Sequence, residues 1–121
     1  MFTLDLMPET TAELALAERR AFSRQFETPL AKFRRPHANT KDPNRQIRVG
    51  FISGDFRDHT AAYMWGPIFE YMNRDRFEVY SYADLMYEDT VGQWFRKASN
   101  GWRNIHQATA QMVDEQIRAD R

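Results

Sequence analysis

The sequence predicts an α/β fold: a partial Rossmann-like lobe in which a parallel sheet of about three strands is flanked by helices, preceded by an N-terminal helix. Strand and helix patterns alternate from residue 45 onward, the strand candidates are rich in β-branched and aromatic residues, and the 121-residue length suits one small domain. This alternation favours right-handed crossovers between parallel strands. We expect an N-terminal helix and linker over residues 1–44 and the incomplete lobe over residues 45–121.

The segment Thr10–Glu27 has the pattern of a helix. Thr10 and Glu13 have the spacing of a capping box, in which each side chain satisfies a backbone donor at the helix start. Apolar residues recur at helical spacing in two neighbouring strips: Leu14, Ala17 and Ala21, and Ala15, Phe22 and Phe26. The Thr28-Pro29 pair is expected to end the helix, because the residue before proline disfavours helical geometry. Residues 32–44 contain basic residues, prolines and asparagines, and are predicted to be a linker.

Three strands and three helices are predicted after the linker. The predicted strands are Ile47–Ile52, Phe77–Ala83 and Trp102–Ile105. The first predicted helix follows Thr60, with Met64, Ile68, Tyr71 and Met72 as its apolar positions and Pro67 either kinking it or marking the first turn of its regular part. The other two are Asp89–Ala98 and Thr109–Ala119.

A polar turn, Ser53–Thr60, follows the first predicted strand. Ligands of open parallel sheets bind outside the carboxyl ends of the strands, where this turn would lie. Its polar members are Ser53, Asp55, Arg57, Asp58 and His59. The start of the following helix would add backbone donors that favour anions. No glycine loop of the dinucleotide-binding or P-loop type is present, so no phosphate-cradling loop is predicted.

His59 is the best candidate for proton transfer, because imidazole exchanges protons near neutral pH. The alternative is that His59 is an N-terminal helix residue that hydrogen-bonds a nearby group. Asp55 has a similar alternative as a helix cap or a brace of the turn, and Arg57 as a solvated surface residue. His37 is expected to be exposed in the linker. His106 follows the third strand and could face the same edge, but no neighbouring residue supports that role.

Composition excludes several classes of function. The charge is balanced, with 17 Lys+Arg and 17 Asp+Glu, which argues against a nucleic-acid partner. There are no cysteines, no histidine pair at metal-ligand spacing and no apolar run near the ~20 residues of a membrane span, so we expect no metal, no other cofactor and a cytoplasmic protein. The aromatic-rich stretches favour a core or an interface, and an exposed sheet edge or apolar face could support a homodimer.

The segment from Ile47 to His59, IRVGFISGDFRDH, resembles the RVGYVS-x-DF-x-x-H segment that opens the catalytic region of O-linked N-acetylglucosamine transferases and SPINDLY-like proteins. The similarity covers most of the chain. Asp75–Tyr82 looks like the second strand of that family, and Trp102–Ile105 like its W-R-x-I strand. The segments His37–Asn39 and Asp42–Arg45 resemble the approach to the first strand.

The resemblance implies a GT-B architecture of two Rossmann-like lobes. It also implies metal-independent, inverting transfer of a sugar from a nucleotide sugar, typically UDP-N-acetylglucosamine, to Ser or Thr of an acceptor protein. Some plant relatives transfer fucose instead. His59 matches the active-site histidine of the family, which lines the cleft between donor and acceptor. Asp55 matches the aspartate of the same turn and is expected, with Ser53 and Asp58, to support His59.

The sequence also departs from the family. Thr60 stands where many members carry proline, and no second lobe, through which the family mainly binds its nucleotide, follows in this sequence. We therefore expect a glycosyltransferase fragment that is inactive alone. The alternative is a non-catalytic binding or homo-oligomerisation module with the same fold. A small independent enzyme using His59 with Asp55 or Asp58 is disfavoured, since no nucleophile or cofactor loop accompanies them.

Overall fold

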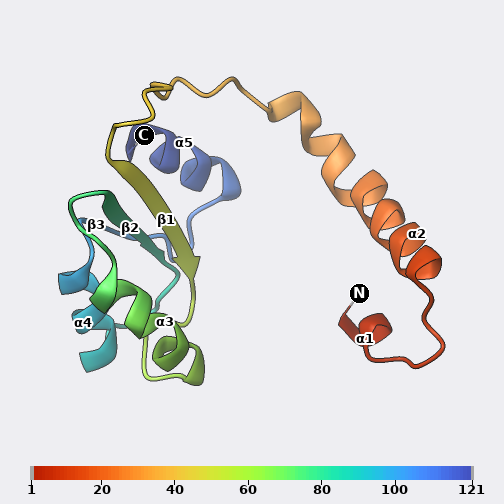
Figure 1. Ribbon diagram of the computed structural model, residues 1–121, viewed down its shortest axis with the longest axis horizontal. Helices are drawn as coiled ribbons and strands as arrows, with labels where there is room; N and C mark the ends of the chain where they lie inside the picture. The colour runs from red at the N-terminus through yellow and green to blue at the C-terminus, as the bar shows by residue number, and fades with distance from the viewer. Residues whose placement is uncertain (1, 121) are drawn as a thin grey trace. The chain divides into compact units, whose positions relative to one another are not determined.

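In the computed structural model, which describes residues 2–120, the chain forms two units, Met1–Ala38 and Asn39–Arg121 (Figure 1). The division falls inside the predicted linker. The first unit contains the short helix α1 (Phe2–Asp5), the helix α2 (Ala12–Phe22), a π-helical turn (Ser23–Glu27) and a 3₁₀ helix (Thr28–Phe33).

The capping of α2 differs from the prediction by one residue. The hydroxyl of Thr11, not that of Thr10, accepts the N–H of Leu14, at 3.2 Å. The hydroxyl of Thr10 instead donates to the carbonyl of Leu4, at 2.7 Å. The predicted cap at Thr10 is therefore wrong. Two adjacent threonines were available to cap the helix, and the Thr10 hydroxyl bonds to the Leu4 carbonyl instead.

The predicted end of the helical segment at Thr28-Pro29 is also wrong. The chain continues in helical turns to Phe33, with Pro29 in the first turn of the 3₁₀ helix. Proline is tolerated there because the first-turn N–H groups have no intrahelical acceptor. The hydroxyl of Thr28 donates to the carbonyl of Ser23, at 3.2 Å, which holds the junction.

The second unit is built on a parallel sheet, as predicted. Its strands are β1 (Ile47–Ser53), β2 (Phe77–Ala83) and β3 (Gly101–Asn104), in the order β1-β2-β3. The strand β3 begins and ends one residue earlier than expected. The Ile105 N–H still donates to the carbonyl of Ala83, so the ladder extends one hydrogen bond beyond the strand.

Helices cover both faces of this sheet (Figure 1). On one face lie α3 (Thr60–Tyr71) and α4 (Thr90–Ala98), and α5 (Ala110–Asp120) lies on the other. The alternation of β2 explains the division: Val79, Ser81 and Ala83 are fully buried, with Val79 and Ala83 in the core below α3 and α4, whereas the Tyr82 hydroxyl reaches α5. The predicted α/β class with helices flanking about three strands is thus confirmed.

The core is an aromatic cluster centred on Phe69, which is 1% exposed. Its ring centroid lies 4.8 Å from that of Phe51, 4.9 Å from that of Phe95 and 5.9 Å from that of Phe56. The cluster therefore joins β1, α3, α4 and the turn after β1 in one packed unit.

The predicted apolar face of α3 is mostly wrong. Met64 and Tyr71 are 76% and 79% exposed, and the residues that α3 buries are Ala62 and Phe69. The helix is apolar on several sides, so helical spacing alone does not select the face that meets the sheet. Pro67 lies inside a regular helix that begins at Thr60, which excludes its reading as the start of the regular part.

The end of α5 is fixed to the sheet by Asp120. Its carboxylate accepts hydrogen bonds from the Arg103 guanidinium at 2.6 Å, the Tyr82 hydroxyl at 2.9 Å and the Gln116 amide at 3.3 Å. The Arg48 guanidinium donates to its backbone carbonyl, at 2.7 Å. Burial acts to raise the pKa of Asp120, but these hydrogen bonds outweigh it and lower the pKa below its usual value.

We expect Asp120→Asn to destabilise the second unit by about 1–3 kcal/mol near pH 6, because charge-assisted hydrogen bonds are lost. Since the folded-state pKa of Asp120 is depressed, its contribution is present above the unfolded-state pKa and is lost as the pH falls through the folded-state pKa. Urea unfolding of both proteins at about pH 6 and about pH 3 checks this. The difference should shrink at the lower pH, and an equal difference at both would contradict the assignment.

Candidate active site

The candidate site is the turn between β1 and α3, at the carboxyl end of β1. The Ser53 hydroxyl accepts the N–H of Asp55, at 2.9 Å, which shapes the turn. His59 has an extended backbone and caps α3: its Nδ1 accepts the Ala61 N–H at 3.2 Å, and its carbonyl accepts the Ala62 N–H at 2.9 Å. Ser53 and His59 therefore fix the turn at its two ends.

Asp55, Arg57 and His59 come together on this turn. The Asp55 carboxylate accepts the Arg57 guanidinium at 3.3 Å, and the same oxygen lies 3.7 Å from the Nδ1 of His59. All three side chains are about 40% exposed, so they are accessible to a ligand. His59 and Asp55, which were expected to interact, therefore lie close together. The Nδ1 atom of His59 nevertheless accepts its hydrogen bond from the N–H of Ala61.

Asp58 makes hydrogen bonds with Tyr63 and Asp89. Its carboxylate accepts the Tyr63 hydroxyl at 2.8 Å, which raises the pKa of Tyr63. Its N–H donates to Asp89, at 2.7 Å, and the second oxygen of Asp89 caps α4 by accepting the Gly92 N–H at 2.8 Å. The backbone donors of Asp58 and Gly92, in that order, lower the pKa of Asp89. Asp89 thus links the site turn to α4.

Gly92 is a further support of the site turn, which passes close to α4 there. A Cβ at Gly92 would lie 2.8 Å from the Phe56 carbonyl oxygen and 2.9 Å from Glu88 Cγ. We expect Gly92→Ala to lower the melting temperature by several degrees and to shift the amide signals of residues 54–59. The Phe56 carbonyl oxygen belongs to the backbone of the turn, so it can make room for the added methyl group only if the turn itself moves.

The matched control is Gly66→Ala, on the neighbouring helix. Its Cβ would meet nothing closer than the Trp94 ring at 3.8 Å, so helix propensity makes this change neutral or slightly stabilising. Thermal unfolding followed by circular dichroism and an amide correlation spectrum test the pair. Equal melting temperatures for the two variants would show that Gly92 does not hold the turn.

His106 is a polar contact of the edge that the sequence did not support. Its Nδ1 lies 2.9 Å from an Asp84 carboxylate oxygen, and the Asp84 N–H donates to the Ser53 carbonyl at 3.0 Å. The Asp84–His106 pair therefore lies at the carboxyl ends of β2 and β3, next to the end of β1. The sequence signal that could have found this pair is its position. Asp84 directly follows β2, His106 lies two residues beyond β3, and the carboxyl ends of parallel strands meet at one edge. His37 belongs to the other unit.

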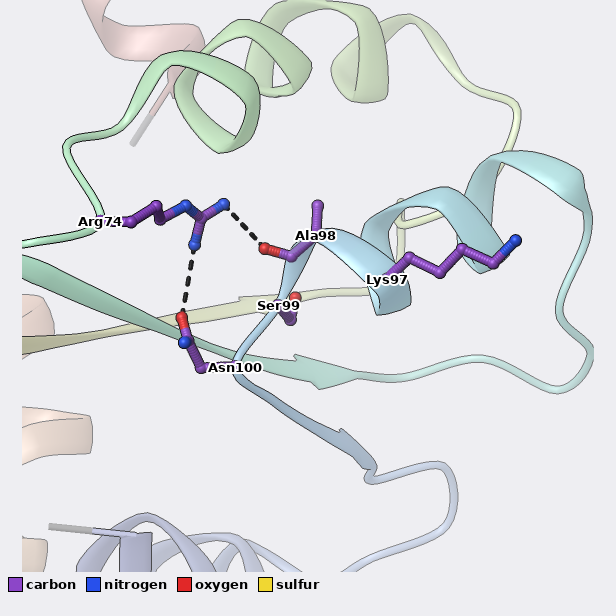
Figure 2. Close-up of a pocket in the computed structure, with 5 residues that line it drawn as sticks. All are labelled: Arg74, Lys97, Ala98, Ser99 and Asn100. Carbon is purple, nitrogen blue, oxygen red and sulfur yellow. Dashed lines mark hydrogen bonds between the residues drawn. The ribbon is translucent and has the colours of Figure 1, made fainter.

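Two hollows in the second unit are not lined by residues of the turn Ser53–Thr60. One, of about 300 Å³, lies at the amino ends of β2 and β3 and is lined by Arg74, Lys97, Ala98, Ser99 and Asn100 (Figure 2). The Arg74 guanidinium is engaged there by the Phe69 carbonyl at 2.5 Å, the Ala98 carbonyl at 2.7 Å and the Asn100 side chain at 3.3 Å. A second hollow, of about 330 Å³, lies between α3 and α4.

Among residues 2–120, no group of three or more His, Asp or Glu side chains could hold a metal ion. No helix among them is long and apolar enough to cross a membrane.

The chain is similar in sequence to parts of two curated plant proteins. The chain is 29% identical over 87 residues to the probable UDP-N-acetylglucosamine–peptide N-acetylglucosaminyltransferase SPINDLY of Petunia hybrida, covering 69% of this chain and 9% of that protein. It is 36% identical over 39 residues to the probable transferase SEC of Arabidopsis thaliana, covering 32% of this chain and 4% of that protein. No family model matches the chain.

A solved structure shows the same arrangement. A variant of an O-GlcNAc transferase from Thermobaculum terrenum superposes with a TM-score of 0.73 and is 30% identical, covering 83% of this chain and 19% of that chain. The chain therefore spans a fifth or less of the length of these relatives.

Proposed function

Because this chain belongs, by sequence and fold, to the O-linked N-acetylglucosamine transferase and SPINDLY-like family, we propose that it is part of the catalytic region of a protein glycosyltransferase. The observation that carries the proposal is the match in fold and sequence to a solved O-GlcNAc transferase, together with a histidine at the carboxyl edge of the sheet. The reaction is transfer of a sugar from a nucleotide sugar to a Ser or Thr hydroxyl of a protein.

In this proposal the second unit forms part of the N-terminal lobe of a GT-B enzyme, with the turn Ser53–Thr60 facing the cleft between the lobes. UDP-N-acetylglucosamine is the donor substrate, and no metal or other cofactor takes part. The position of the turn at the end of β1 supports this, because ligands of parallel α/β sheets bind outside the strand ends.

His59 would act in this site as a hydrogen-bond donor. Its Nδ1 accepts the Ala61 N–H, so in the neutral ring the proton is carried by Nε2. That N–H can donate to an oxygen of the donor or acceptor. Asp55, with Ser53 holding the turn, lies close enough to pair with His59 if the ring becomes charged.

We propose that this chain alone does not catalyse transfer, because it spans only 19% of the solved transferase that it matches. Titration of UDP and UDP-N-acetylglucosamine into the purified chain, by calorimetry or ligand-observed NMR, tests this. No binding by the folded chain is the expected result. Binding that His59→Ala weakens would mean that this unit carries a nucleotide-sugar site of its own.

A second candidate, a binding or homo-oligomerisation module, is favoured by the exposed apolar face of α3. Met64, Tyr71 and Tyr63 are 76%, 79% and 67% exposed. Among the described residues β1 also has one unpaired edge. Molar mass by light scattering decides between a monomer and a dimer. A dimer that Tyr71→Glu dissociates would support this function, and a monomer at high concentration would count against it.

A further inference from the structure

Two histidines lie at the carboxyl edge of the sheet, and their Nδ1 atoms have opposite kinds of partner. The Nδ1 of His59 accepts a hydrogen bond from a backbone N–H, that of Ala61, at 3.2 Å. The Nδ1 of His106 lies 2.9 Å from a carboxylate oxygen of Asp84. An ionised carboxylate only accepts hydrogen bonds, so the His106 nitrogen must carry the proton. The two neutral rings are therefore opposite tautomers.

This difference decides which histidine can accept a proton. In His59 the proton lies on Nε2, and the lone pair on Nδ1 is occupied by the helix cap. In His106 the proton lies on Nδ1, so the Nε2 lone pair is available. The His106 side chain is 32% exposed, and no hydrogen bond to its Nε2 occurs among residues 2–120. We propose that His106, positioned by Asp84, is a proton-accepting site for a substrate hydroxyl at this sheet edge.

The pair is held by the backbone rather than by flexible side chains alone. The Asp84 N–H donates to the Ser53 carbonyl at 3.0 Å, and the Ile105 N–H to the Ala83 carbonyl at 2.8 Å, so both segments continue the sheet ladder. The His106 N–H donates to the Asn104 side chain at 2.9 Å. The next residue, Gln107, has a φ of 62°, a left-handed conformation that is uncommon outside glycine and frequent near functional sites.

The edge brings His106 within reach of the site turn. Neighbouring strands lie about 4.8 Å apart, so the ends of β1 and β3 are separated by roughly 10 Å. Asp84, between them, touches the last residue of β1 through its backbone. A substrate hydroxyl above β2 and β3 could therefore contact His106 while the rest of the substrate extends toward His59.

The proposed step rests on the proposed function. The acceptor O–H proton passes to the Nε2 of His106 as the acceptor oxygen forms a bond to the sugar C1. The bond between C1 and the diphosphate oxygen breaks, and the nucleoside diphosphate leaves with the electron pair. Asp84 stabilises the imidazolium that forms, by the same geometry that sets the tautomer of the neutral ring.

The direct test is a long-range ¹H–¹⁵N correlation spectrum of the 121-residue chain, recorded where both rings are neutral. We expect His106 as the Nδ1–H tautomer and His59 as the Nε2–H tautomer. Asp84→Asn should shift His106 toward a mixture and leave His59 unchanged. Asp55→Asn is the matched control and should leave His106 unchanged. His106 found as the Nε2–H tautomer in the folded chain would overturn the inference.

The rate of chemical modification tests whether the Nε2 lone pair of His106 is available. This measurement uses the wild-type chain alone, so differences in folding between variants do not affect it. Diethylpyrocarbonate modifies an unprotonated imidazole nitrogen, and mass spectrometry locates the product. In the wild-type chain, His106 should react several-fold faster than His59, with the exposed His37 as the internal reference. Equal rates at His106 and His59 would contradict the assignment, since His59 would then have an available lone pair.

The transfer step has its own readout. In an active transferase that contains this segment, His106→Gln should lower kcat about 100-fold, the usual range for a general base, with the KM for the nucleotide sugar little changed. Unchanged kcat overturns the catalytic role of His106. The two proposals fail separately. A longer protein that contains this segment and neither binds the nucleotide sugar nor transfers the sugar counts against the glycosyltransferase function, whereas the tautomers and reactivities decide the inference about His106.

Discussion

Phe69→Ala is expected to remove a large share of the stability of the second unit. Phe69 is 1% exposed, and its ring contacts those of Phe51, Phe56 and Phe95. Truncation of a buried phenylalanine costs about 3–5 kcal/mol. A unit of this size has a total stability of roughly 4–12 kcal/mol, so the substitution removes a large share of it.

The matched control is Met64→Ala, on the same helix. Met64 is 76% exposed, so little apolar contact is lost and the free energy of unfolding should change by less than about 0.5 kcal/mol. Urea unfolding of the two variants and the wild type, followed by tryptophan fluorescence and circular dichroism, gives the comparison. A Phe69→Ala protein that unfolds at the wild-type denaturant concentration would contradict the packing of the aromatic cluster.

Arg74→Met is expected to destabilise the second unit by about 2–4 kcal/mol. One guanidinium nitrogen donates both to the Phe69 carbonyl in the last turn of α3 and to the Ala98 carbonyl at the end of α4. The second terminal nitrogen donates to the Asn100 side-chain oxygen (Figure 2). That oxygen also accepts the Val79 N–H. A cation is favoured at the C-terminal ends of two helices, and methionine leaves their carbonyls without this partner.

Arg76→Met is the control for the loss of charge, because Arg76 is exposed and two residues away. We expect it to change the free energy of unfolding by less than about 0.5 kcal/mol. The measurement is chemical denaturation of the three proteins at the same ionic strength. Equal destabilisation by both substitutions would show that net charge, rather than the bonds to the helix ends, explains the effect.

The parts of the fold that were predictable are those with a local cause. Phe77–Ala83 alternates between a buried face and a second face, and its predicted bounds are those of β2. The turn Ser53–Thr60 was predictable because a strand pattern, a short polar segment and a helix pattern follow one another. Asp89, predicted as the first residue of a helix, is the N-cap of α4, which is the difference of one residue that helix ends commonly show.

The parts that were not predictable depend on contacts distant in sequence. The buried side of α3 is selected by Phe51, Phe56 and Phe95, which the helix sequence does not contain. The pairing of Asp84 with His106 spans 22 positions and requires β2 and β3 to be neighbours. His59 was predictable from its place after the first strand and from the resemblance of its segment to the family. The Ala61 N–H, which sets the tautomer of His59, is evident only in the structure.

We propose above all that this chain supplies part of a glycosyltransferase site. The most direct measurement is sugar transfer by a chimera in which this chain replaces the matching segment of the Thermobaculum terrenum transferase. The expected result is transfer of N-acetylglucosamine to a serine- or threonine-containing peptide, lost in the His59→Ala chimera. A folded chimera that binds UDP but transfers no sugar would contradict the claim.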